Sequence, residues 1–224
     1  MWVGHYASAF IAKPFAPGIP LSVLALASSA ADALFFLLNF AGLESFNLDP
    51  AIVARSGCFP YTNDYPYSHS LVGMGVAGAA VAFGYKLLSP GARVSLTDFA
   101  VITATGLSHF LLELPVHRKD VKITPHDDVA AGAGWFDSPV VDFLAENALF
   151  LASLWFYTRF APKVTQTGWL TNKGRLTWIA LFFAAQQAQF CFMAAPTQEA
   201  RWVHAPLFLG MILGSSWLLG KLES

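Results

Sequence analysis

Long apolar stretches alternate with short polar ones along the chain, and six of them are each close to the length of a membrane-spanning helix, about 20 residues. We expect transmembrane helices over residues 19–41, 69–88, 96–114, 138–160, 176–195 and 203–219. Segment 2–12 is apolar but too short to span a membrane. It could form a half-helix, an interfacial helix or a re-entrant segment. The pattern predicts an all-α polytopic membrane helix bundle forming one domain, residues 1–224.

Local signals place two of the helix starts. Ser95 and Asp98 have the spacing of a capping box, so a helix is expected to begin at about residue 96. Ser138 and Pro139 suit an N-cap and a first helical turn. Glycine and alanine are frequent in segment 69–88, which favours close packing against a neighbouring helix.

Composition supports a lipid bilayer as the main partner. The chain is 55% hydrophobic and only 12% charged, whereas soluble domains carry about 25% charged residues. A net charge of -1 gives no electrostatic basis for binding nucleic acid. Cys58 and Cys191 lack the spacing of a metal motif, and we expect no disulfide framework. The first residues lack the basic-then-apolar order of a cleaved signal peptide, so we interpret them as mature sequence.

Six spans would place both termini on one side of the membrane. Basic residues are more numerous on that side, eight against five, which predicts cytoplasmic termini. The eight are Lys13, Lys86, Arg93, Arg159, Lys163, Lys173, Arg175 and Lys221, and the five are Arg55, Arg118, Lys119, Lys122 and Arg201. The two long loops, 44–68 and 115–138, would then lie together on the non-cytoplasmic side.

This topology gathers acids and histidines at one membrane face. Ionisable groups in an apolar span are costly and usually functional. Asp32 would lie roughly 15 Å below that face, at 1.5 Å per helical residue. The residues expected at the face itself are His69, His109, Glu113, Asp142, Glu146 and His204. We therefore expect a polar funnel that narrows towards Asp32.

His109 and Glu113 are four residues apart and would share one helix face. An imidazole and a carboxylate at this spacing can bind one divalent metal, although a helix-end hydrogen bond would look the same. His117 follows directly beyond this pair. Asp142 and Glu146 are also four apart, and Asp142 can be explained by the helix dipole alone.

His5 is the residue that the topology does not accommodate. A cytoplasmic terminus would keep it away from the funnel unless the N-terminal segment re-enters the membrane. Around the expected funnel mouth, aromatic and polar side chains are candidates for substrate binding. These are Tyr65, Tyr67, Trp135, Asn147 and His204.

In their order along the chain, several of these residues resemble a known membrane family. It comprises small bacterial inner-membrane proteins described as metal-dependent hydrolases of the LexA-binding type, distantly similar to zinc-dependent phospholipase C. The resemblance covers about residues 1–145 and rests on short motifs: GHYAS with His5, ASSAADALFF with Asp32, YPYSHSLVG with His69, and SHFLLELPVH with His109 and Glu113. It departs from the family where Glu113 replaces the usual Asp and Ala31 replaces the usual proline.

The resemblance implies a ligand set of His5, Asp32, His69, His109 and Glu113 for one or two divalent ions, zinc fitting the imidazole and carboxylate mixture best. The function expected is hydrolysis, or a related lyase reaction, of a phospholipid or another lipophilic small molecule. Glu146 or His117 would act as general acid or base, with Asp142 or Asn147 supporting an imidazole.

Three other functions use the same residues. Carboxylates in an apolar funnel can serve a metal-free isomerase, cyclase or epoxide hydrolase. Intramembrane Asp and His also occur in small transporters and proton or ion relays. Haem held by His69 and His109 is a further alternative.

Overall fold

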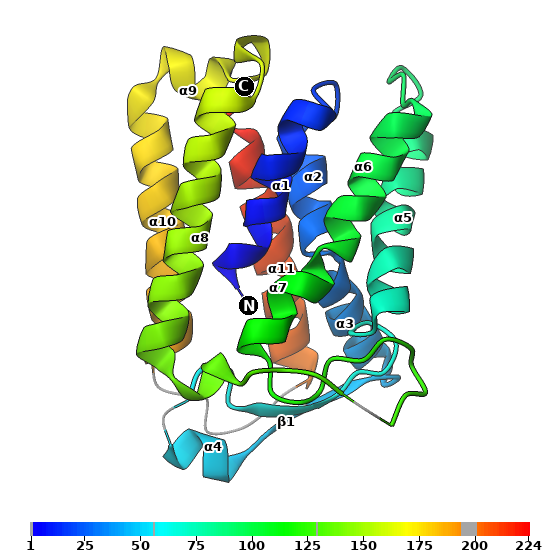
Figure 1. The fold of residues 1–224 in the computed structure, drawn as a ribbon, viewed down its shortest axis with the longest axis vertical. Coiled ribbons are helices and arrows are strands. Elements are labelled where there is room, and N and C mark those ends of the chain that lie inside the picture. Colours follow the sequence, from blue (N-terminus) through cyan, green and yellow to red (C-terminus); the bar gives the residue numbers. More distant parts are fainter. Residues whose placement is uncertain (1, 56, 129, 194–200) are drawn as a thin grey trace.

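The structure is a computed structural model that describes residues 2–55, 57–128, 130–193 and 201–224. Its helices run side by side along one direction, and loops with a small hairpin close one end of the bundle (Figure 1). The outer helices are α5 (Leu71–Leu88), α6 (Leu96–Leu107), α7 (His109–Val116), α8 (Pro139–Phe160), α10 (Lys173–Phe192) and α11 (Arg201–Gly220). The predicted all-α class is confirmed.

Among the described residues, four segments are long and apolar enough to cross a membrane, not the six predicted. They are Leu71–Leu88, Leu96–Val116, Pro139–Phe160 and Arg201–Gly220. A fifth requires the bent pair α2 (Leu21–Ser28) and α3 (Ala30–Ala41) to count as one span. The expected span 176–195 corresponds to α10, in which three glutamines near the C-terminal end lower the hydropathy. Residues 194 and 195 lie outside the described residues.

The predicted span 19–41 is not one straight helix. It breaks at Ser28 and Ser29, and α2 and α3 meet at an angle of 60°. Both serine hydroxyls donate to the carbonyl of Ala25, at 2.7 and 3.0 Å. A break of this kind leaves main-chain groups without helical partners, and such groups must be satisfied inside the protein. This break supplies one of the contacts of the site below.

The N-terminal segment is a short helix inside the bundle. It consists of the 3-10 turn Val3–His5, helix α1 (Tyr6–Ala12) and the 3-10 turn Lys13–Phe15. Helix α1 packs against α2 and α8 and lies among the other helices in Figure 1. Its far end is held by buried Lys13, whose Nζ lies 2.5 Å from Glu223 Oε1. Of the three predicted forms, a buried half-helix describes it best.

Glycines allow α5 and α6 to approach closely. A Cβ on Gly78 would lie 2.8 Å from the Thr103 carbonyl oxygen, and one on Gly106 would lie 2.5 Å from the Gly78 Cα. The predicted capping box of Ser95 and Asp98 starts α6. Pro139 occupies the first turn of α8 as predicted, although the Ser138 side chain makes no cap hydrogen bond.

The loops at the closed end contain the only sheet among the described residues. Strand β1 (Ser45–Leu48) pairs antiparallel with β2 (Tyr61–Asp64), and helix α4 (Pro50–Ala54) connects them. The 3-10 turn Trp135–Asp137 lies in the second long loop. Loops 44–68 and 117–138 meet at this end, where the Cys58 N–H donates a hydrogen bond to the carbonyl of Phe136 at 2.7 Å. The opposite end carries the turn Lys163–Thr165 and helix α9 (Thr167–Thr171).

Candidate functional site

Three polar side chains of the site come from one helix face. His109, Glu113 and His117 follow each other at four-residue intervals, so α7 and its C-cap present them as a row. All three are buried. Glu113 contacts His117 through Oε2 and lies 3.6 Å from His109 Nε2 through Oε1. The sequence predicted this pairing of His109 with Glu113, and the structure adds His117 to it.

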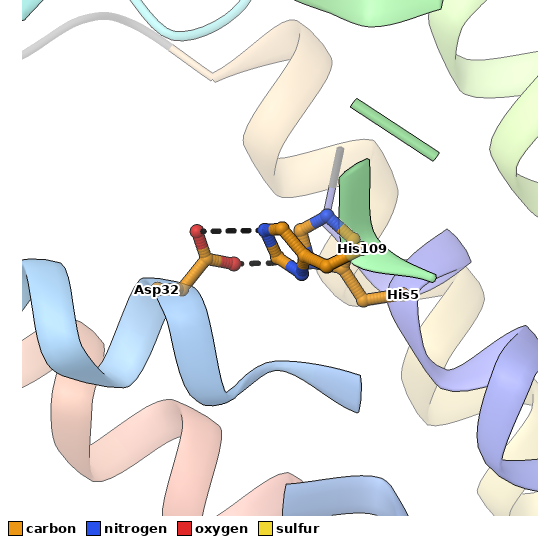
Figure 2. Close-up of side chains that lie close together, drawn as sticks. All are labelled: His5, Asp32 and His109. Atoms are coloured by element: carbon orange, nitrogen blue, oxygen red, sulfur yellow. Dashed lines mark ion pairs between the residues drawn. The ribbon is translucent and has the colours of Figure 1, made fainter. Parts of the chain in front are cut away.

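His5 reaches the row from the N-terminal helix. Its Nε2 contacts Glu113 Oε1, and its Nδ1 lies 2.9 Å from Asp32 Oδ2. Figure 2 shows the Asp32 carboxylate facing the imidazoles of His5 and His109. Asp32 stands in the first turn of α3, just after the helix break, where an N-terminal helix dipole favours a negative charge.

His69 completes the group and is oriented by residues behind it. Its Nε2 lies 3.2 Å from Asp32 Oδ1, and its Nδ1 lies 2.9 Å from the Ser68 hydroxyl. Ser68 donates its single hydroxyl proton to Glu44 Oε2 at 2.7 Å. The hydroxyl therefore accepts from His69 Nδ1, which leaves the Nε2 lone pair facing Asp32.

The helix break orients His109 in the same way as Ser68 orients His69, with Nδ1 protonated and Nε2 facing Asp32. Its Nδ1 lies 2.8 Å from the carbonyl oxygen of Ser28, which can only accept, so Nδ1 carries the proton. Nε2 has no hydrogen-bond partner within the described structure and lies 3.6 Å from Asp32 Oδ1. A nitrogen lone pair and a carboxylate oxygen that face each other repel unless a proton or a metal ion lies between them.

These donors fit a divalent metal. Two groups have ligand atoms that all lie within 4.8 Å of one another, His5 with Asp32 and His109, and His69 with His109 and Glu113. Imidazole and carboxylate are common zinc ligands, and ligating histidines usually donate their other N–H to a carbonyl or another acceptor. His109 and His69 both do so, through Ser28 and Ser68. The two overlapping groups allow one or two ions.

His117 lies at the rim, where loop residues contact it. Its Nδ1 is 2.7 Å from the Tyr65 hydroxyl and 2.9 Å from Asp120 Oδ1. Burial lowers the pKa of His117, but the negative charge of Glu113 and the hydrogen bond with Asp120 outweigh it and raise the pKa to about 9. Burial and then the charge of Asp120 raise the pKa of the Tyr65 hydroxyl well above its usual range.

An aromatic cavity opens beside the polar group. Asp32, His69 and His117 supply its polar wall, together with Tyr65 and Asn63. The remaining lining is apolar: Trp2, Phe35, Phe36, Phe59, Phe136, Phe190 and Phe208. A larger hollow of about 910 Å³ between α10, α11 and the closing loops shares Trp2, Phe59, Phe190 and Phe208 with it. The cavity beside the polar group is small, about 30 Å³, and the room for an apolar group lies in the neighbouring hollow.

Glu146 and Asp142 lie elsewhere in the bundle. Glu146 Oε2 accepts from the main-chain N–H groups of Trp2 and Gly4, at 2.6 and 3.1 Å. Gln187 Oε1 accepts from Val3 N–H at 3.3 Å. These side chains satisfy the first N–H groups of the N-terminal helix, which have no partners within the helix. Asp142 makes its hydrogen bonds to Gln187 and Cys191.

The predicted substrate-binding residues divide between the site and other places. Tyr65 lines the cavity and contacts His117. Tyr67 and Trp135 are exposed, and the Asn147 amide donates to the Phe143 carbonyl of its own helix at 2.8 Å. His204 packs beside the rings of Phe46 and Tyr61. The last four therefore make none of the site contacts described above.

The sequence analysis did not identify four groups that have roles near the site. Glu44 and Ser68 orient His69, the Ser28 carbonyl orients His109, and Gln187 holds the N-terminal turn. A glutamate in a loop gave no signal that it would be buried. The serine pair 28–29, in contrast, interrupts an apolar stretch and could have indicated a helix break.

No family model, curated protein or solved structure matches the chain.

Proposed function

We propose that the protein is a membrane-embedded, metal-dependent hydrolase that acts on a lipophilic substrate. The observation that carries this proposal is the orientation of His109, whose Nδ1 is committed to the Ser28 carbonyl while Nε2 faces Asp32 and Glu113. Such an arrangement is costly in an apolar bundle without a cation to offset it. The resemblance of the His5, Asp32, His69 and His109 motifs to the LexA-binding-type hydrolases points the same way.

His5, Asp32, His69, His109 and Glu113 are the proposed ligands of one or two ions, zinc being the metal we expect. When bound, such an ion polarises a substrate oxygen and lowers the pKa of a bound water towards about 7. Asp32 contacts His5 and His69 and so connects the N-terminal helix with the loop before α5. It would bridge the two groups of ligands.

His117 is the residue we assign to proton transfer, because it lines the cavity and contacts Glu113. Tyr65 and Asp120 hold its ring from the other side. Glu146 and Asp142 were the other candidates from the sequence. The hydrogen bonds of Glu146 favour a different role, in which it positions the N-terminal turn. The phenyl rings around the cavity would take the apolar part of a phospholipid or of a hydrophobic small molecule.

We further propose that α10 crosses the membrane with the other long helices, which restores the six-span arrangement. The excess of basic residues would then favour a cytoplasmic location for the end bearing α9. The site would open on the non-cytoplasmic side, beneath the loops that carry Glu44, Tyr65 and His117.

Metal analysis of the protein purified in detergent without chelator tests the proposal. We expect at least one zinc-class ion per chain, and hydrolysis of a lipophilic ester or phosphodiester that stops on chelation and in His109→Ala. A metal-free preparation with activity equal in wild type and His109→Ala would refute it. Activity that survives strong chelators would favour the metal-free isomerase, cyclase or epoxide hydrolase.

The break between α2 and α3 supports a second candidate, a small transporter or ion relay. Broken helices with a charged residue at the break are a common way to bind ions within membranes, and Asp32 follows this break. Ion or proton flux into liposomes that depends on Asp32, without turnover of any lipid, would favour transport over hydrolysis.

A further inference from the structure

A second group of metal-binding side chains lies apart from the histidines. Cys58, Asp142 and Cys191 have ligand atoms that all lie within 4.8 Å of one another, and all three residues are buried. Cys58 comes from the loop before β2, Asp142 from the start of α8 and Cys191 from the end of α10. They share no residue with the histidine site, and their spacing along the sequence does not match a metal-binding motif.

We propose that Cys58, Asp142 and Cys191 bind a zinc-class ion, a site distinct from the histidine centre. Two thiolates and one carboxylate are a donor set that favours Zn²⁺ over Mg²⁺ or Ca²⁺. The Cys191 Sγ and Asp142 Oδ2 atoms are 3.3 Å apart. In a tetrahedral zinc site, Zn–S and Zn–O distances of about 2.3 and 2.1 Å put neighbouring S and O ligands about 3.5 Å apart.

The surroundings of Asp142 support a cation here. Its Oδ2 accepts from Gln187 Nε2 at 3.1 Å, but its Oδ1 has no hydrogen-bond partner among the described residues. An ion held with the two cysteines would give Oδ1 a partner. Gln187 lies beside the group as a neighbour of both Asp142 and Cys191.

The site would fasten a closing loop to the bundle. Phe59, directly after Cys58, has a φ of 44°, which is strained for a residue with a large side chain. The same phenyl ring lines the cavity of the histidine site and the larger hollow. A metal at Cys58 would hold this strained turn against α8 and α10. The inference does not rest on the proposed hydrolase activity.

Cobalt provides a selective test because the histidine site contains no sulfur donor. Purified full-length protein in detergent would be stripped of metal with chelator under reducing conditions and titrated with Co²⁺. We expect thiolate-to-cobalt charge-transfer absorption whose final intensity corresponds to one thiolate-bound Co²⁺ per chain. The band should be lost in Cys191→Ser and Cys58→Ser and retained in His109→Ala. The same cysteine variants should lose one equivalent of zinc.

Thiol labelling of the wild type keeps the test decisive if the variants fail to fold. We expect both cysteines to resist a thiol reagent with zinc bound and to react after chelation. Absence of the charge-transfer band from folded, reduced wild-type protein would overturn the proposal. It would also be overturned if the cysteines became reactive with a reductant but not with a chelator, since that result indicates a Cys58–Cys191 disulfide.

Discussion

Glu146 on α8 accepts a hydrogen bond from the main-chain N–H of Gly4, 3.1 Å away and 142 positions earlier in the chain. The same Oε2 atom accepts from Trp2 N–H at 2.6 Å. The carboxylate thus caps a helix that starts inside the bundle, where water is not available to do so. The next residue in this turn, His5, contacts Asp32 and Glu113. Glu146, which lies outside the histidine cluster, therefore positions the proposed ligand His5.

Replacing Glu146 separates positioning from proton transfer. Glu146→Ala leaves two buried N–H groups without an acceptor, at about 1–3 kcal/mol each, so we expect lower stability and weaker metal binding. Glu146→Gln keeps an oxygen acceptor and should retain most of the bound metal and activity. Metal content and thermal unfolding in detergent would be measured for both. Equal and complete loss of activity in the two variants, with metal retained, would instead assign proton transfer to Glu146.

Loss of His109 should remove metal from the histidine site. His109→Ala deletes the imidazole that both groups of ligands share, so at least one ion per chain should be lost on elemental analysis. His126→Ala is the matched control, because His126 lies in the loop after α7 and makes none of the site contacts. The same metal content in both variants and the wild type would contradict the assignment.

Glu44 is connected to the site through Ser68, whose hydroxyl contacts His69. Its carboxylate accepts from Ser68 Oγ at 2.7 Å and from Ser68 N–H at 2.9 Å. Removal of such an outer partner costs about 10–100-fold in metal affinity, so Glu44→Ala and Ser68→Ala should both weaken binding by that factor. Competition with a chromophoric chelator measures it. An affinity that falls in Ser68→Ala but is unchanged in Glu44→Ala would contradict this role of Glu44.

Two glycines of α5 should respond in opposite ways to alanine. Gly78→Ala places a methyl group 2.8 Å from the Thr103 carbonyl oxygen and should destabilise the α5–α6 pair by about 1–3 kcal/mol. Among the described residues, nothing besides the adjoining backbone of its own helix lies within 4 Å of a Cβ added at Gly84. Gly84→Ala should therefore be neutral or stabilise by up to about 1 kcal/mol. Thermal unfolding in detergent compares them, and equal melting temperatures would contradict the close helix contact.

Sequence reasoning found the residues of the histidine site better than it found the path of the chain. His109 and Glu113 were paired correctly from their four-residue spacing, which a helix imposes whatever surrounds it. His69 lies near them in the structure, and so does Asp32. The counting of spans had placed Asp32 roughly 15 Å below the membrane face that carries the histidines, which is wrong, and only the family resemblance grouped it with the histidines. The expected convergence of Glu146 and His204 on the same funnel is not observed. Hydropathy does not reveal which side of a helix faces its neighbours when the helix is apolar on every face, so it could not place these two side chains.

The sequence by itself determined the apolar helices, their approximate ends and the donor spacing on α7, because these depend on local composition and on the period of the helix. Only the tertiary structure decided that the 19–41 stretch bends at Ser28 and that His5 enters the bundle. It also brought Cys58, Asp142 and Cys191 together from three distant segments. These arrangements depend on long-range hydrogen bonds to buried main-chain groups, and no local pattern specifies the partners of such bonds.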